Sequence, residues 1–151
     1  MRTRILGLTL ALTASLWCAP AAALTPQGEY QRDVFRATNK QRAQHDLVRL
    51  QRQACVQKYA VRQAKRMAQQ ERIFHQDLLP ILLECGLRKA GENVGYGYAT
   101  GKALVNRGWM RSPDHRDNIL DREFRVLGVG ARRSDDGTWY SAQVFGRALL
   151  P

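Results

Sequence analysis

Residues 112–120 read Ser-Pro-Asp-His-Arg-Asp-Asn-Ile-Leu, and residues 91–93 read Gly-Glu-Asn. In the longer stretch, Ser112 is a typical helix N-cap and Pro113 suits the first helical turn, so a short helix is predicted to run to the end of the stretch. His115 then lies in the first turn, where unpaired backbone N–H groups disfavour a charged imidazole. Its ring is expected to stay neutral, as a metal ligand or a general base requires.

Three side chains are the candidates for a ligand cleft: Glu92, His115 and, further upstream, His75. One carboxylate and two imidazoles can bind Zn²⁺ or another divalent cation with one position open for water. They can equally form a hydrogen-bonded cluster without a metal. Separations of 17 and 23 residues match no compact metal motif, so spacing alone favours the buried polar cluster. No catalytic residue is assigned.

The remaining pattern predicts an α+β domain with a small antiparallel sheet between helical layers. The segments expected in chain order are a long helix at 28–50, a second helix at 54–71, a short irregular or helical segment at 77–86, a glycine-rich strand at 91–98, a helix at 100–110 capped by Thr100, the short helix described above, and two strands at 125–133 and 138–147 joined by an Asp-Asp-Gly turn.

The first 23 residues have the pattern of a secretory signal peptide. Arg2 and Arg4 precede an apolar run at 5–16, and three alanines at 21–23 form a cleavage site. The apolar run is shorter than the roughly 20 residues that span a membrane. Cleavage would leave residues 24–151 as one domain of 128 residues. We expect a monomeric secreted or periplasmic protein with no transmembrane segment after cleavage.

The chain is strongly basic, with 24 Lys and Arg residues against 13 Asp and Glu residues. The signal segment holds two of the cations and no acid, so the remaining chain carries a net charge of +9. Such a charge attracts anionic lipid surfaces or cell-wall polymers. Many cations lie in 32–72, where a solvated helix face is the simpler interpretation. Nucleic acid is not expected as a partner, because no aromatic-basic recognition motif accompanies the charge.

Cys55 and Cys85 are the two cysteines that remain after signal cleavage. In an exported protein, two cysteines predict one disulfide. Closure of a loop of about 31 residues should stabilise the fold by roughly 3–4 kcal/mol in the chain-entropy model. A metal site at these cysteines would need further Cys or His residues at short spacing, and neither cysteine has them.

Four stretches occur in an informative order between about Val34 and Gly146: Gly91-Glu92-Asn93-Val94, Trp109-Met110-x-Ser112-Pro113-x-His115-Arg116-x-Asn118-Ile119-Leu120, Gly128-Val129-Gly130, and Tyr140-x-x-Gln143-Val144-Phe145-Gly146. Together they closely resemble the CAP superfamily, which comprises cysteine-rich secretory proteins, antigen 5 and pathogenesis-related 1 proteins. The resemblance is to its short bacterial, secreted branch.

The resemblance implies an α-β-α sandwich with a central cleft that holds a His/Glu/Glu/His tetrad, which binds a divalent metal in some members. His75, Glu92 and His115 match three of these four groups, and Ser112 stands where the second glutamate is expected. The function implied is binding of a lipid, sterol, glycan or peptide in the cleft. One alternative is metal-dependent, protease-like hydrolysis in the same cleft, and another is binding of anionic lipid or cell-wall polymer by the basic surface.

The other motif residues are expected to act in the structure. Trp109 is expected to pack in the core, and Asn93 and Asn118 are expected to anchor loop backbone. Arg116 is expected either to form an ion pair with Asp117 or Asp121 or to cover the rim of the cleft. Gly128 and Gly130 are expected to allow close packing of a strand.

Overall fold

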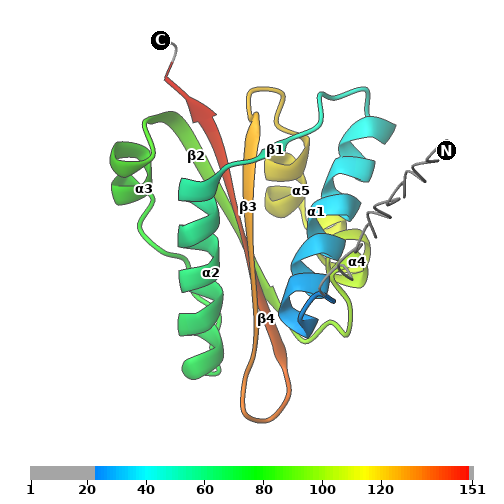
Figure 1. Ribbon diagram of the computed structural model, residues 1–151. Coiled ribbons are helices and arrows are strands. Elements are labelled where there is room, and N and C mark those ends of the chain that lie inside the picture. Colours follow the sequence, from blue (N-terminus) through cyan, green and yellow to red (C-terminus); the bar gives the residue numbers. More distant parts are fainter. Residues whose placement is uncertain (1–22, 150–151) are drawn as a thin grey trace, which may run out of the picture.

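The computed structural model describes residues 23–149 (Figure 1), so the predicted signal peptide lies outside the described residues except for Ala23. The helices and strands are α1 (Pro26–Gln44), β1 (Gln51–Arg52), α2 (Ala54–Gln69), α3 (Leu79–Glu84), β2 (Leu87–Tyr96), α4 (Gly101–Ala103), the π-helical turn η1 (Leu104–Gly108), the 3₁₀ turn η2 (Trp109–Arg111), α5 (Pro113–Leu120), β3 (Val126–Arg133) and β4 (Trp139–Ala148).

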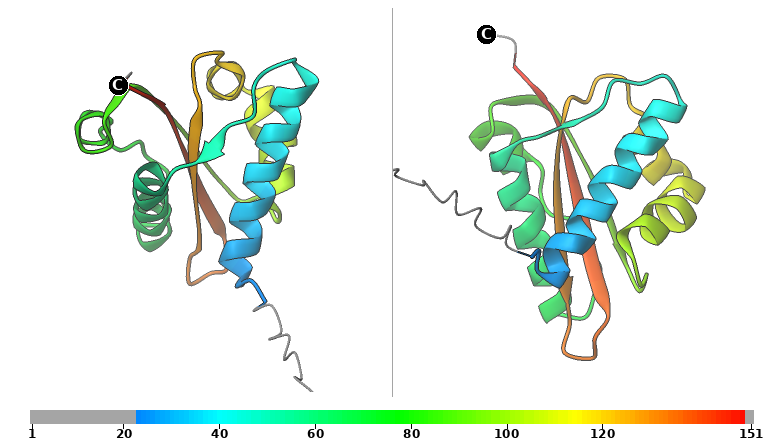
Figure 2. Two further views of the ribbon diagram at one scale, coloured as in Figure 1. Left: turned by 45° about the horizontal axis from the view of Figure 1, so that its top comes forward. Right: turned by 45° about the vertical axis from the view of Figure 1, so that its right-hand side comes forward.

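The elements form three layers, as predicted. Helix α2 covers one face of the sheet, and α1, α4 and α5 cover the other (Figures 1 and 2). Two glycines let α2 approach the sheet closely. A Cβ atom added at Gly130 would lie 2.0 Å from the carbonyl oxygen of Ala60, and one at Gly128 would lie 2.4 Å from that of Val56. The predicted close packing of this strand is therefore packing against the α2 backbone.

The sheet has four strands in the order β1-β3-β4-β2. The pairs β2–β4 and β3–β4 are antiparallel, but β1 pairs with β3 in parallel, so the sheet is mixed rather than purely antiparallel. Strand β1 has only two residues and no hydrophobic pattern of its own. It forms because the backbone N–H of Gln51 donates to the carbonyl of Arg125 over 2.8 Å.

Two predicted helices end differently in the structure. Helix α1 ends at Gln44 rather than near residue 50, because the chain turns at Asp46, whose φ of 55° is left-handed. The helix predicted for 100–110 keeps its Thr100 cap, whose Oγ1 accepts from the N–H of Ala103 over 3.1 Å. After one turn, however, it widens into η1 and then tightens into η2, and hydrophobic periodicity does not distinguish these forms from an α-helix.

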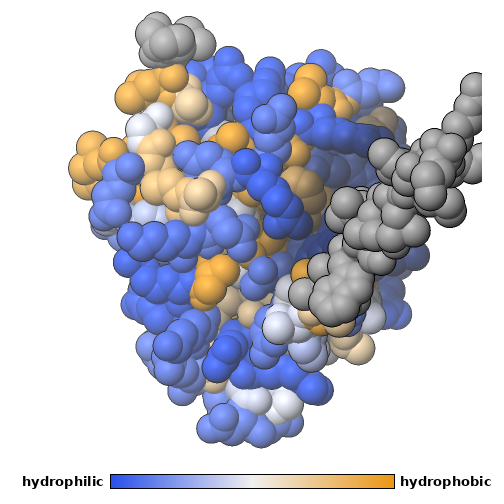
Figure 3. Space-filling view, in the orientation of Figure 1, coloured by the Kyte–Doolittle hydropathy of each residue, from blue (hydrophilic) through white to orange (hydrophobic). Residues whose placement is uncertain are grey.

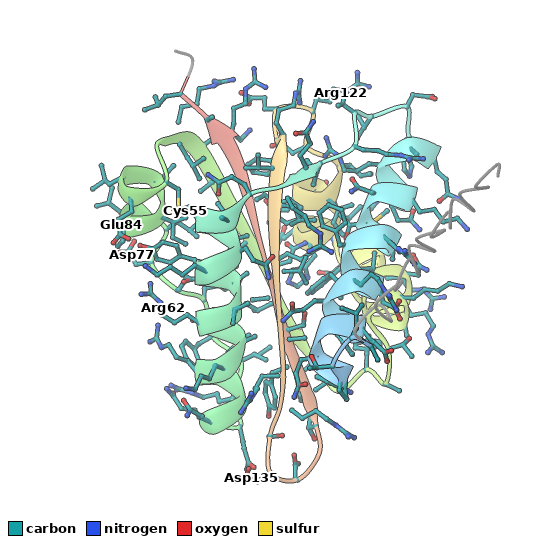
Figure 4. The ribbon with its side chains drawn as sticks, viewed as in Figure 1. Cys55, Arg62, Asp77, Glu84, Arg122 and Asp135 are labelled. Atoms are coloured by element: carbon teal, nitrogen blue, oxygen red, sulfur yellow. A yellow bond between two sulfur atoms is a disulfide. The ribbon has the colours of Figure 1, made fainter. Side chains whose placement is uncertain are left out.

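Buried polar contacts join the layers on the α1 side. The guanidinium of Arg42 is fully buried and donates to the carbonyls of Val48, Ile119, Asp121 and Phe124. It thereby ties α1 to the loop after α5. On the other side, the predicted disulfide forms between Cys55 in α2 and Cys85 after α3, with a Cα–Cα distance of 5.6 Å (Figure 4).

The surface is mostly hydrophilic, with hydrophobic side chains gathered over α3 and near the end of β4 (Figure 3). The exposed residues there are Leu79, Leu83 and Leu149. In the part of the chain that the structure describes, no helix has the length and apolar character needed to cross a membrane.

Candidate functional site

Strand β2, which forms one edge of the sheet, carries Glu92 in contact with His75 and Asn93 in contact with the backbone of His115. Alternate residues of a strand face opposite sides. Glu92 shares a face with Val94, which packs among residues of α2, whereas Asn93 faces α5 and the carbonyl of His115. The site therefore wraps around the β2 edge, with Glu92 on one side and α5 on the other.

Glu92 holds the loop between α2 and α3. Its side chain is only 2% exposed, yet its carboxylate accepts three hydrogen bonds. The donors are His75 Nδ1 at 2.8 Å, the backbone N–H of Gln76 at 3.1 Å and Gln76 Nε2 at 2.6 Å. Because a carboxylate accepts, the His75 ring carries its proton on Nδ1. The ring itself is 61% exposed, so a buried anion orients an imidazole that faces solvent.

His115 lies in the first turn of α5, as predicted, and its Nδ1 lies 2.9 Å from the hydroxyl of Ser112. Ser112 occupies the N-cap position but makes no side-chain capping bond there. Burial lowers the pKa of His115, and the neighbouring His75 lowers it further. The expected neutral ring is thus supported, although the causes are burial and a second histidine.

The other motif residues cover the free edge of β2. Unpaired edge carbonyls invite pairing with another chain unless they are covered. The carbonyl of Glu92 accepts from Asn118 Nδ2 over 3.2 Å, and that of Val94 accepts from Trp109 Nε1 over 2.9 Å. Trp109 is 2% exposed, in agreement with its predicted core position. Asn118 Nδ2 also donates to Asn93 Oδ1 over 3.0 Å, which fixes α5 against the strand.

The profile of the cysteine-rich secretory protein family, CAP, matches residues 35–145, which include every residue of the site. The chain belongs to the CAP family.

Several bacterial proteins are similar to this CAP domain. The uncharacterized protein YkwD of Bacillus subtilis is 30% identical over 125 residues, which cover 78% of this chain and 48% of that protein. A crystal structure of an extracellular SCP-domain protein from Bacillus anthracis matches with a TM-score of 0.70 at 28% identity, covering 84% of this chain and 45% of that one. A cysteine-rich secretory protein of Staphylococcus aureus has the same TM-score at 18% identity, covering 83% and 41%. The chain spans about half the length of these relatives or less.

The donor set of this CAP domain does not fit a divalent cation. Within the described residues, no group of three or more His, Cys, Asp or Glu side chains is arranged to hold a metal. Both oxygens of Glu92 accept hydrogen bonds, His115 contacts a hydroxyl, and Ser112 supplies no carboxylate. The Glu92 carboxylate and the Nδ1 atoms of His75 and His115 are bonded to other groups, and no three His, Cys, Asp or Glu side chains are grouped to hold a metal in residues 23–149.

Arg116 does not form the predicted ion pair. It is exposed, and residues 23–149 contain no carboxylate paired with it. Asp121 instead pairs with Lys89 Nζ at 2.7 Å, because β2 brings that lysine beside the end of α5. The residue that sequence reasoning missed is Gln76, whose two bonds to Glu92 complete the site. Its position next to His75 was the only signal.

Proposed function

We propose that this chain is a secreted CAP-domain binding protein whose site at the β2 edge, formed by His75, Glu92 and His115, binds a hydroxyl-rich ligand such as a glycan. The observation that carries the proposal is how the two rings are held. Each Nδ1 is bound by a protein group, His75 by Glu92 and His115 by Ser112. Neither Nε2 has a hydrogen-bond partner within residues 23–149.

The two free nitrogens can have complementary roles. When the His75 ring carries a single proton, that proton is on Nδ1, and its Nε2 can accept a hydrogen bond. When the Ser112 hydroxyl donates to His115 Nδ1, the Nε2 of His115 carries the proton and donates. A ligand with several hydroxyl groups can donate to one ring and accept from the other. The surrounding groups Gln76 and Ser112 are polar as well, which favours a glycan over an apolar lipid or sterol.

Imidazole NMR spectra test this proposal with an internal control. The chain has three histidines, and His45 lies at the C-terminal end of α1, away from β2. On titration with soluble peptidoglycan fragments or N-acetylglucosamine oligomers, the Nε2 signals of His75 and His115 should shift and the signals of His45 should not. His75→Ala and His115→Ala should each abolish saturable binding, whereas His45→Ala should retain it. Equal shifts at all three rings, or unchanged binding by both site variants, would contradict the proposal.

The metal-dependent alternative is weaker on the same geometry, because the donor set does not fit. No hydrolytic step is therefore assigned to these residues. Zinc analysis after purification separates the two functions: we expect substoichiometric zinc that His115→Ala leaves unchanged. One equivalent of zinc per chain, lost in His115→Ala, would favour the metal-dependent alternative instead.

A further inference from the structure

A second feature lies on the outer face of α1, separate from the β2-edge site. Three adjoining hollows run along this helix and the neighbouring α4–η1 segment, with volumes of about 480, 230 and 380 Å³. The first and second share Arg36 and Lys40, and the second and third share Lys102 and Asn106. Because neighbouring hollows share lining residues, they lie side by side in one row, which we call the α1 groove.

The α1 groove is lined by unpaired positive charge. Its cations are Arg36, Lys40, Arg49, Lys102 and Arg107. All five are exposed, and none pairs with a carboxylate within the described residues. One acidic side chain, Asp33, lines the middle hollow. The distribution attracts a ligand with several negative charges in a row.

The walls of the groove are already held in place. Gln41 Nε2 donates to Asn106 Oδ1 over 2.8 Å and joins α1 to η1. At the other end, the Asn39 side chain bonds to both the N–H and the carbonyl of Leu50, at 2.7 and 3.0 Å. These bonds fix α1 against both neighbouring segments, so little ordering is needed when a ligand binds.

Two observations narrow the chemistry of the ligand. The aromatic ring in the groove, Phe35, is covered by the guanidinium of Arg52 at 4.2 Å from the ring centroid, which removes a stacking surface for a nucleic-acid base. The exposed leucines of α3 lie on the other side of the sheet (Figure 1). On the α1 side of the described chain the exposed large hydrophobic side chains are Leu24 and Val48, one beyond each end of α1, which do not form the apolar face that a membrane anchor needs. The groove therefore suits a soluble chain of phosphates.

We propose that the α1 groove binds a linear phosphate polymer through successive phosphates. Inorganic polyphosphate of defined length, labelled for fluorescence anisotropy, is the probe. The groove variant is Arg36→Gln/Lys40→Gln/Lys102→Gln. The matched control is Lys58→Gln/Arg62→Gln/Lys65→Gln, which removes the same charge from exposed positions of α2 across the sheet (Figure 4). All six substituted residues are exposed, so the groove variant should unfold at the wild-type midpoint. The control also loses the contact of Arg62 with the Tyr59 ring, 4.4 Å from its centroid, and should unfold at a slightly lower midpoint.

Counterion release sets the expected size of the effect, about 0.7 in log K per unit of log salt for each phosphate contact on a single strand. With five contacts, affinity should fall roughly 100-fold between about 50 and 200 mM salt. The groove variant keeps two contacts and should lose only roughly sevenfold over that range, while binding more weakly at the lower salt. The α2 control should behave like the wild type.

Equal loss in the two variants would show that net charge, rather than the groove, binds the polymer, and would overturn the proposal. Tighter binding of anionic vesicles or of a DNA duplex than of polyphosphate would overturn it as well. If the triple variant does not fold, Arg49→Gln/Arg107→Gln tests the two ends of the same groove and should leave roughly three contacts, or about a 20-fold salt effect. His75→Ala should not change polyphosphate binding, so this test is independent of the β2-edge site.

Discussion

Replacement of Glu92 by glutamine tests what the buried carboxylate holds in place. It accepts from His75 Nδ1, from the backbone N–H of Gln76 and from Gln76 Nε2, with only 2% of its side chain exposed. Glutamine has nearly the same size but lacks the charge, and one of its two terminal groups is a donor. At least one of the three donors then loses its acceptor or must rearrange.

The structure predicts unequal contributions from the two partners. A hydrogen bond to a charged group contributes about 1.5–3 kcal/mol, and an unpaired buried donor costs about 1–3 kcal/mol. The contact to His75 contributes less because that ring is 61% exposed, and exposed pairs are worth roughly 0–1 kcal/mol. We expect Glu92→Gln to lower the free energy of unfolding by about 2–4 kcal/mol and His75→Ala to lower it by less than about 1 kcal/mol.

Urea unfolding followed by tryptophan fluorescence measures both losses, and the double variant gives the coupling between the two residues. Glu123→Gln is the matched control, because that carboxylate is 46% exposed and pairs with Arg88 and Lys89 at the surface. It should change stability by less than about 1 kcal/mol. Equal losses for His75→Ala and Glu92→Gln would refute the reasoning, because the His75 contact and not the Gln76 segment would then hold the loop.

Three further predictions concern packing, titration and the disulfide. Gly130→Ala places a Cβ atom 2.0 Å from the Ala60 carbonyl and should destabilise the fold by about 1–3 kcal/mol or more in urea, whereas Gly28→Ala in α1 should cost nothing. His115 should titrate by NMR below the pKa of about 6.5 of an unperturbed imidazole. Below that pH the unfolded chain binds more protons at His115 than the folded chain does, so the free energy of unfolding should decrease as the pH falls. His115→Ala should make the free energy of unfolding less dependent on pH in this range. Reduction of the Cys55–Cys85 disulfide should lower stability by roughly 3–4 kcal/mol, and an unchanged urea midpoint would count against the entropic account.

Most of the fold could be predicted because its signals are local. The N-cap and proline at Ser112 and Pro113 place α5, and the Asp-Asp-Gly turn places the β3–β4 hairpin. The features that sequence reasoning missed depend on contacts between distant segments. Strand β1 exists through a bond from Gln51 to Arg125, and the end of α1 depends on a turn at Asp46 that no proline or glycine marks.

In the candidate site, too, the residues in local motifs could be predicted and those brought in by distant contacts could not. Glu92 and His115 stand in recognisable stretches, so both could be proposed as site residues from the sequence. The role of Gln76 was not, because two of the three bonds to the carboxylate come from a loop whose path is set by packing. The ion pair that was one of the two alternatives for Arg116 rested on proximity in sequence, whereas Lys89 reaches Asp121 from the neighbouring strand.

Ser112 places a neutral hydroxyl group, rather than a carboxylate, beside His115. A carboxylate beside His115 would favour the charged ring and raise its pKa. The hydroxyl found there bonds to Nδ1 without adding charge, while burial and the neighbouring His75 act in the opposite direction and lower the pKa. The two imidazoles therefore have different partners: an anion orients His75, and a neutral hydroxyl orients His115. A metal site needs ligand atoms that converge on one point, whereas a hydroxyl ligand needs one acceptor and one donor. Serine in place of glutamate therefore suits the proposed hydroxyl ligand better than a metal.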